Sequence, residues 1–158
     1  MRSTICGILL LAASSLSVGD PGPCQAGLDQ FTSGDYAAAQ RILWDCVESH
    51  LGNATHAFYL ALTYRSLKNY DTGLSRTNAA LKQSPEDVDL LYLAAYLRYR
   101  GNETKDSMVL LSKAYRLAPK DWRLHQLFAL NYISFDMLDA AKLSLFQAIA
   151  LNPNNAEL

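Results

Sequence analysis

The sequence lacks an excess of charge of either sign. Its 158 residues include 14 lysines and arginines against 15 aspartates and glutamates, so the formal net charge at pH 7 is -1. Proteins that hold nucleic acid or an anionic membrane by charge present a strongly basic surface. The balance therefore predicts no nucleic-acid partner, and the hydrophobic fraction of 50% predicts a globular chain rather than a disordered one.

Residue patterns that carry chemistry are also absent from the sequence. The histidines, His50, His56 and His125, form no HExxH motif, and the cysteines form no CxxC motif. There is no Gly-x-Ser-x-Gly elbow and no phosphate-binding glycine loop. We therefore expect a protein that is not an enzyme, with no catalytic residues, no metal and no cofactor.

Long hydrophobic runs are missing except at the start of the chain. Residues 1–19 place Arg2 before the uncharged stretch 5–13 and end in small residues, which is the order of a secretory signal. The stretch is shorter than the roughly 20 residues that span a bilayer. An uncleaved anchor or an N-terminal helix is the alternative. We predict a signal peptide over 1–19, a mature domain over 20–158 that does not insert into a membrane, and a secreted or periplasmic location.

Cysteine is scarce, and removal of the predicted signal leaves only Cys24 and Cys46. An even number of cysteines in an oxidising compartment is compatible with a disulfide. We expect Cys24 near the start of one helix and Cys46 near the end of its antiparallel partner, and those two ends meet in space. A bond there would stabilise the fold by about 3 kcal/mol through the entropy of the unfolded chain. Two buried free thiols are an equally good interpretation.

What the sequence does contain is a regular period. Pro119 follows Pro85, and Pro153 follows Pro119, by the same interval. We divide the chain into blocks as long as this proline interval, which begin at residues 20, 54, 88 and 122. When the blocks are aligned, small residues fall into three columns: Gly27, Ala61, Ala95 and Ala129; Ala39, Gly73, Ser107 and Ala141; Cys46, Ala80, Ala114 and Ala148. Each block has the apolar spacing of two helices, such as 56–67 and 70–83. Small residues let crossing helices approach, and a lone helix pair cannot bury both apolar faces, so we expect the blocks to stack.

These columns resemble the tetratricopeptide-repeat family, whose pattern is Trp-x2-Leu-Gly-x2-Tyr followed by alanines and a closing proline. The matching residues of the fourth block are Phe128, Ala129, Tyr132, Ala141, Leu145, Ala148 and Pro153. Those of the second block are Leu60, Ala61, Tyr64, Gly73, Ala80 and Pro85. The third block departs from the pattern, because Arg98 replaces the family's tyrosine. The resemblance implies an all-α, right-handed superhelical solenoid of antiparallel helix pairs, with repeats at about 20–53, 54–87, 88–121 and 122–155.

The resemblance also implies a non-enzymatic scaffold whose first helices line a concave groove for a protein or peptide partner. The residues that we predict for this groove are Phe58, Arg65, Tyr92, Tyr96, Tyr99, Arg100 and Arg123. The three tyrosines share a helix face because they are four and three residues apart. Tyrosine and arginine are the residue types that dominate binding hot spots. The alternatives are that the tyrosines fill gaps between helices and that the arginines are solvated.

The last predicted helix, about 137–151, is unusually apolar for the end of a repeat stack. Its only charges are Asp139 and Lys142. Repeat arrays normally finish with a polar capping helix, whereas residues 156–158 read as the start of a fifth repeat. We expect this face to be covered by self-association or by a partner, unless the chain is shortened. The function we predict is an exported adaptor, and the alternatives are a structural subunit that assembles through this face or a regulatory fragment of a larger exported enzyme.

Overall fold

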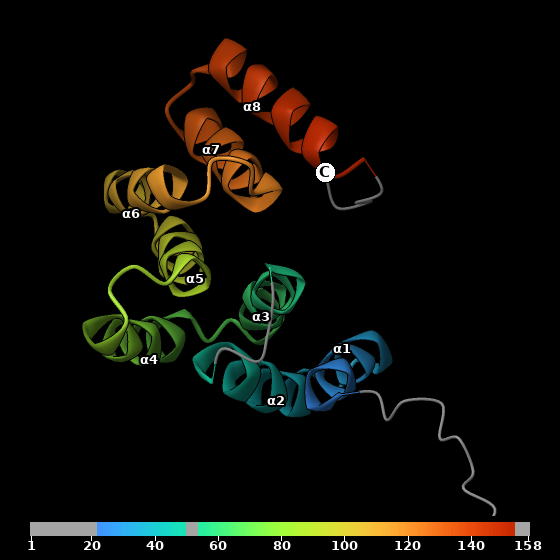
Figure 1. The fold of residues 1–158 in the computed structure, drawn as a ribbon. Coiled ribbons are helices and arrows are strands. Elements are labelled where there is room, and N and C mark those ends of the chain that lie inside the picture. The colour runs from blue at the N-terminus through green and yellow to red at the C-terminus, as the bar shows by residue number, and fades with distance from the viewer. Residues whose placement is uncertain (1–21, 50–53, 154–158) are drawn as a thin grey trace, which may run out of the picture.

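Eight α-helices follow one another in the computed structural model, which describes residues 22–49 and 54–153 (Figure 1). They are α1 (Pro23–Ser33), α2 (Tyr36–Glu48), α3 (Ala54–Leu67), α4 (Tyr70–Gln83), α5 (Val88–Arg100), α6 (Thr104–Leu117), α7 (Trp122–Ser134) and α8 (Leu138–Leu151). The described ranges contain no strand, so the predicted all-α class is confirmed. The predicted signal over 1–19 and the tail over 156–158 lie outside the described residues.

The helices form a curved stack in which α3, α5 and α7 occupy the inner side and α4 and α6 the outer side (Figure 1). In the second, third and fourth helix pairs, the first helix begins at residue 54, 88 or 122. In all four pairs, the second helix begins at residue 36, 70, 104 or 138. The helix starts therefore follow the period of the sequence. None of the described helices has both the length and the apolar character that crossing a bilayer requires.

One residue reverses the chain inside each helix pair. Gly34, Lys68, Asn102 and Asp136 all have positive φ, at 85°, 52°, 62° and 59°. Neighbouring members of this set are one repeat period apart, so every pair uses the same left-handed turn. Only in the first turn is the positive-φ residue a glycine, the residue that adopts this conformation without a steric cost.

The columns of small residues mark the places where helices touch most closely. Ala61, Ala95 and Ala129 have no exposed surface. A Cβ atom added to Gly73 of α4 would lie 2.8 Å from the ring of Tyr64 of α3, which is itself fully buried. A larger side chain in these columns would push the backbones apart, which explains why the period carries small residues.

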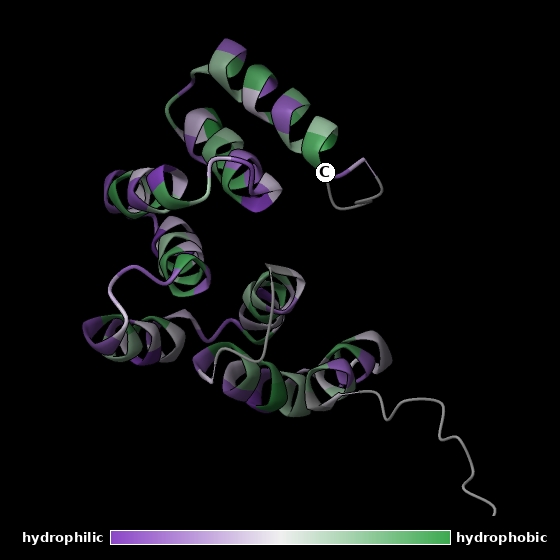
Figure 2. Cartoon of the chain, viewed as in Figure 1, coloured by the Kyte–Doolittle hydropathy of each residue, from purple (hydrophilic) through white to green (hydrophobic). Residues whose placement is uncertain are grey.

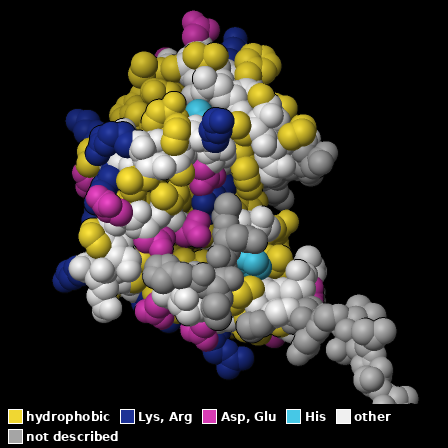
Figure 3. Space-filling model, in the orientation of Figure 1, with side chains coloured by type: hydrophobic (Ala, Val, Ile, Leu, Met, Phe, Trp, Pro, Cys, Tyr) yellow, Lys and Arg dark blue, Asp and Glu magenta, His cyan; other side chains and the backbone are white. Residues whose placement is uncertain are grey.

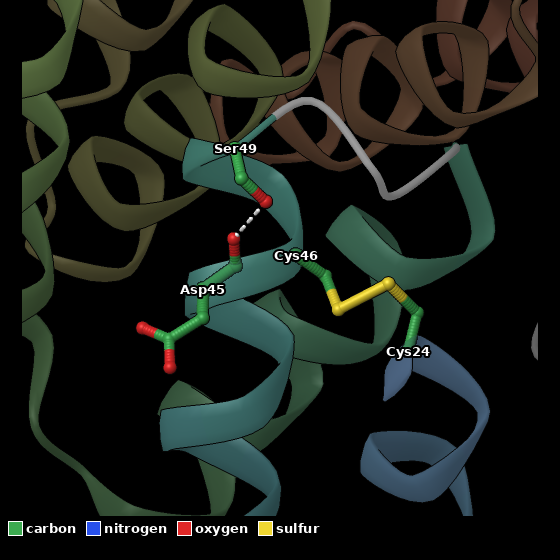
Figure 4. The surroundings of a disulfide bond; sticks show 4 residues. All are labelled: Cys24, Asp45, Cys46 and Ser49. Atoms are coloured by element: carbon green, nitrogen blue, oxygen red, sulfur yellow. Dashed lines mark hydrogen bonds between the residues drawn. A yellow bond between two sulfur atoms is a disulfide. The ribbon is translucent and has the colours of Figure 1, made fainter. Parts of the chain in front are cut away.

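A disulfide joins the first turn of α1 to the last turn of α2 (Figure 4). The Cα atoms of Cys24 and Cys46 are 5.7 Å apart. Both residues are buried, with 7% and 3% of their surface exposed. The antiparallel pairing of α1 and α2 brings these two ends together, so the first pair is covalently closed.

Candidate functional site

A pocket of about 180 Å³ opens on the inner side of the stack, between α3, α5 and α7. Its lining residues are Phe58, Leu62, Arg65, Tyr92, Tyr96, Tyr99, Arg100, Gln126, Leu127 and Leu130. Six of the seven groove residues predicted from the sequence lie in this lining, and Arg123 does not. The lining follows the period, because Phe58, Tyr92 and Gln126 occupy the same position in three successive pairs.

The floor of the pocket is formed by two tyrosines of α5. Tyr92 and Tyr96 have 2% and 6% of their surface exposed, and their ring centroids are 6.4 Å apart. Burial raises the pKa of both phenols above the ordinary tyrosine value. These hydroxyls are therefore neutral at physiological pH and can donate hydrogen bonds. Tyr99, one turn further along α5, is only half-buried.

An aromatic contact closes the pocket at the end where α3 and α7 begin. The rings of Phe58 and Trp122 meet edge to face with centroids 4.9 Å apart. This contact joins first helices that are two pairs apart in the sequence. Because Phe58 is only 4% exposed, this end of the pocket is apolar and tightly packed.

The opposite end of the pocket is basic. Arg65 lies in the last turn of α3 and Arg100 in the last turn of α5, and both are exposed. Arg100 Nη2 donates a hydrogen bond of 3.1 Å to the hydroxyl of Tyr70, and its guanidinium lies 5.4 Å from the centre of that ring. Burial alone would lower the pKa of Arg100, but the Tyr70 hydrogen bond and nearby tyrosines outweigh it and raise the pKa. Among the described residues, neither arginine forms an ion pair with a carboxylate.

Arg123, the seventh predicted groove residue, lies outside the pocket lining and is buried. Only 2% of it is exposed, and its guanidinium lies 4.9 Å from the centre of the Tyr92 ring. Its Nε donates to Asp121 Oδ1 at 3.0 Å, and its Nη2 is 2.7 Å from Asp89 Oδ1. These two carboxylates draw the side chain into the gap between α5 and α7. Asp89 and Arg123 are one repeat period apart, so opposite charges at equivalent positions were the sequence signal for this contact.

Solved structures with the same arrangement of helices decide the fold. TTC0263, a thermophilic TPR protein of Thermus thermophilus, superposes with a TM-score of 0.63 at 22% identity, over 83% of this chain and 73% of that one. MamA of Desulfovibrio magneticus RS-1 gives 0.56 at 18% identity, over 87% and 78%. The chain has the tetratricopeptide-repeat fold. It is a right-handed superhelical solenoid of about four helix pairs, as the sequence predicts.

A third solved structure with this fold is that of a peptide-binding protein. YrrB, described as a TPR protein with an unusual peptide-binding site, superposes with a TM-score of 0.56 at 13% identity, over 84% of this chain and 69% of that one. Scans against protein-family models and curated proteins gave no match. These likenesses establish the fold, and the chemistry of the groove follows from this chain's own residues.

Sequence reasoning missed Tyr70, the residue that holds Arg100 at the pocket. Tyr70 lies on α4, a second helix, whereas the repeat pattern assigns the groove to first helices. Its hydroxyl reaches the carbonyl of Arg65 at 3.4 Å as well as the Arg100 guanidinium. No periodic signal marks such a cross-helix contact. The part of the chain that the structure describes contains no cluster of three or more metal-binding side chains.

The last repeat exposes a second, apolar surface on α8. Its most exposed large side chains are Leu138, Leu143 and Phe146, at 54%, 61% and 69%. Hydrophobic residues recur along α8 in Figure 2 and gather at the α7–α8 end in Figure 3. Ile149 is the repeat equivalent of Tyr115, whose ring packs edge-on against Phe128 of the following helix, 5.8 Å between centroids. Ile149 thus occupies a position that the preceding repeat uses to hold the next helix, whereas Val109, the repeat equivalent of Leu143, is 70% exposed on α6.

Proposed function

We propose that this protein is an exported, non-enzymatic adaptor that binds a protein or peptide partner in the pocket between α3, α5 and α7. The observation that carries the proposal is the composition of that pocket. Tyrosine hydroxyls lie on its floor, and at its end lie two arginines that pair with no carboxylate among the described residues. These groups offer hydrogen bonds and charge beside apolar surface, which is the chemistry of protein-binding hot spots. The peptide-binding description of YrrB, a protein of the same fold, supports this use of the groove.

Two features support export. Residues 1–19 have the order of a secretory signal. The Cys24–Cys46 bond is of a kind that persists in oxidising compartments and is rare in the cytosol. A secreted or periplasmic location is therefore part of the proposal.

The test is capture of partners by chemical crosslinking in the protein's own compartment. The groove variant combines Tyr99→Ala with Leu130→Ala, because both side chains line the pocket and are only half-buried. The matched control combines Val109→Ala with Leu117→Ala on α6, which are exposed outside the pocket. We expect the groove variant to lose the crosslinked partner and the control to keep it, with unchanged circular dichroism in both. Equal capture by both variants would contradict the proposal.

The exposed face of α8 favours a second candidate function, a structural subunit that self-associates through its C-terminal helix. A second copy is the occupant that we propose, because the exposed side of α1 is polar at Gln25, Asp29 and Thr32. The apolar face of α8 therefore packs against α8 of the second copy rather than against its α1. A contact between two identical surfaces gives a two-fold dimer, whereas a contact between α8 and α1 would give a filament. The oligomeric state in solution tests this candidate.

A further inference from the structure

We propose that the groove selects a partner segment with one bulky apolar side chain followed closely by an aspartate or glutamate. The apolar side chain enters the pocket between α3, α5 and α7, and the carboxylate meets Arg65 and Arg100. This inference rests on the proposed function and adds the chemistry of the partner.

The size of the pocket sets the first half of the motif. A cavity of about 150 Å³ in another protein admits benzene, and this pocket has about 180 Å³. It therefore accommodates one side chain of the size of phenylalanine or leucine. Phe58, Leu62, Leu127 and Leu130 supply apolar walls, the tyrosine rings add aromatic surface, and Gln126 and the two arginines supply the polar part of the lining. Burial of one large apolar side chain is the kind of contact that anchors a peptide in a groove.

The pattern of ion pairs around the pocket sets the second half of the motif, the acidic residue. Two other arginines of the inner helices already have carboxylates: Arg98 with Glu103, and Arg123 with Asp121 and Asp89. Arg65 and Arg100 have none among the described residues. The acidic side chains at the other end of the pocket are those that pair with Arg123, so the open end has an unneutralised positive charge.

The two arginines lie at the same end of the pocket, and Tyr70 links them. The hydroxyl of Tyr70 donates to the carbonyl oxygen of Arg65 at 3.4 Å and accepts from Arg100 Nη2 at 3.1 Å, and both arginines line the pocket beside Tyr96. Tyr70 uses its hydroxyl to hold Arg100, and its ring lies beside the guanidinium, so Arg100 is positioned without being neutralised. A carboxylate above Tyr96 would receive charged hydrogen bonds from guanidinium groups, which are stronger than neutral ones.

The carboxylate belongs to a side chain rather than to the end of the partner chain. A second hollow of about 240 Å³, lined by Tyr99, Arg100, Asn102 and Ser134, adjoins the pocket beyond Arg100. Its lining is polar, which suits the backbone of a peptide. A bound segment can therefore continue past the arginines toward α7, so its chain does not have to stop there.

The test is a selection of phage-displayed random peptides, which have no free carboxyl terminus, on the folded mature protein. Each selected peptide is then retested on the Tyr99→Ala and Leu130→Ala double variant to identify groove-dependent binders. We expect these binders to share an aromatic or branched aliphatic residue next to an aspartate or glutamate. Groove-dependent binders without acidic residues would overturn the inference and leave the proposed function standing. A selection without any groove-dependent binder would overturn both.

The selected peptides are then synthesised with amidated ends and titrated by fluorescence anisotropy. Replacing the acid by its amide should weaken binding about two- to fivefold, as should Arg65→Gln or Arg100→Gln. The control Arg116→Gln, an exposed arginine of α6, should leave the affinity unchanged. Binding to wild type should weaken as salt rises. An amide peptide that binds as well as its acid, or binding that requires a free terminal carboxylate, would contradict the inference.

Discussion

The replacement of Arg123 by methionine tests whether this side chain holds the groove together from beneath rather than binding a partner. Methionine retains most of the apolar stem and removes the guanidinium. The loss leaves Asp89 and Asp121 facing each other across the α5–α7 gap without a positive charge between them. It also removes the cation from the face of the Tyr92 ring, 4.9 Å away. The backbone N–H of residue 123 still donates to Oδ1 of Asp121, the N-cap of α7, so the start of α7 is preserved.

The magnitude follows from burial. Removing one partner of a buried ion pair costs about 3–5 kcal/mol in the free energy of unfolding. The Asp89 and Asp121 side chains keep 25% and 10% of their surface exposed, so part of their hydration returns when the arginine is lost. We therefore expect a loss of about 3 kcal/mol, which corresponds to a fall in Tm of about 10 °C for a chain of this size.

Urea unfolding followed by circular dichroism measures this loss. Arg116→Met on the exposed side of α6 is the matched control and should stay within about 0.5 kcal/mol of wild type. Adding Asp89→Asn to Arg123→Met should restore at least about 1 kcal/mol of the lost free energy of unfolding, because it removes one of the two unpaired negative charges. The reasoning is refuted if Arg123→Met is as stable as the control.

Three further predictions concern packing, the disulfide and the α8 face. Gly73→Ala should lower the free energy of unfolding by about 1 kcal/mol in urea titration, since overpacking against the buried tyrosine exceeds the gain in helix propensity. Gly101→Ala, whose added Cβ meets nothing closer than 3.5 Å, should be neutral or slightly stabilising. Reducing Cys24–Cys46 should cost about 3 kcal/mol, and two reactive thiols from these residues in unreduced, denatured protein would disprove the bond. Phe146→Glu should convert a dimer to a monomer in light scattering, and a wild type that is monomeric at all concentrations would refute self-association.

The positions of the helices could be predicted from the sequence because the packing requirement repeats. A second-helix residue such as Gly73 faces the same crossing in every pair, so the need for a small side chain recurs once in each repeat. The predicted second helix over 70–83 coincides with α4, and α3 begins two residues before the predicted start at 56. The stacking of helix pairs was therefore accessible from the period, and the resemblance to the tetratricopeptide-repeat family implied the right-handed superhelical solenoid.

The chemistry of the groove was less accessible, because it depends on contacts between helices. The position of Arg123 on a first helix does not reveal that its side chain is buried beneath the floor, although the acidic residue at its repeat-equivalent position, Asp89, was a signal for one of its two carboxylate partners. Arg100 forms no ion pair with a carboxylate of the described residues, and its hydrogen-bond partner Tyr70 approaches from α4 in the outer layer. Such partnerships are decided by side-chain reach across the stack, and the repeat pattern specifies only which positions face inward.

The left-handed turn inside each pair also sets the rotational phase of the helix that follows it. One extra residue at Asn102 would turn the whole of α6 by about 100° around its axis. Ser107 and Ala114, now at helix crossings, would then swing away and larger side chains would take their places. The shared turn thus fixes which face of each second helix packs against its neighbours. Insertions or deletions at these four turns should therefore destabilise the fold far more than substitutions there.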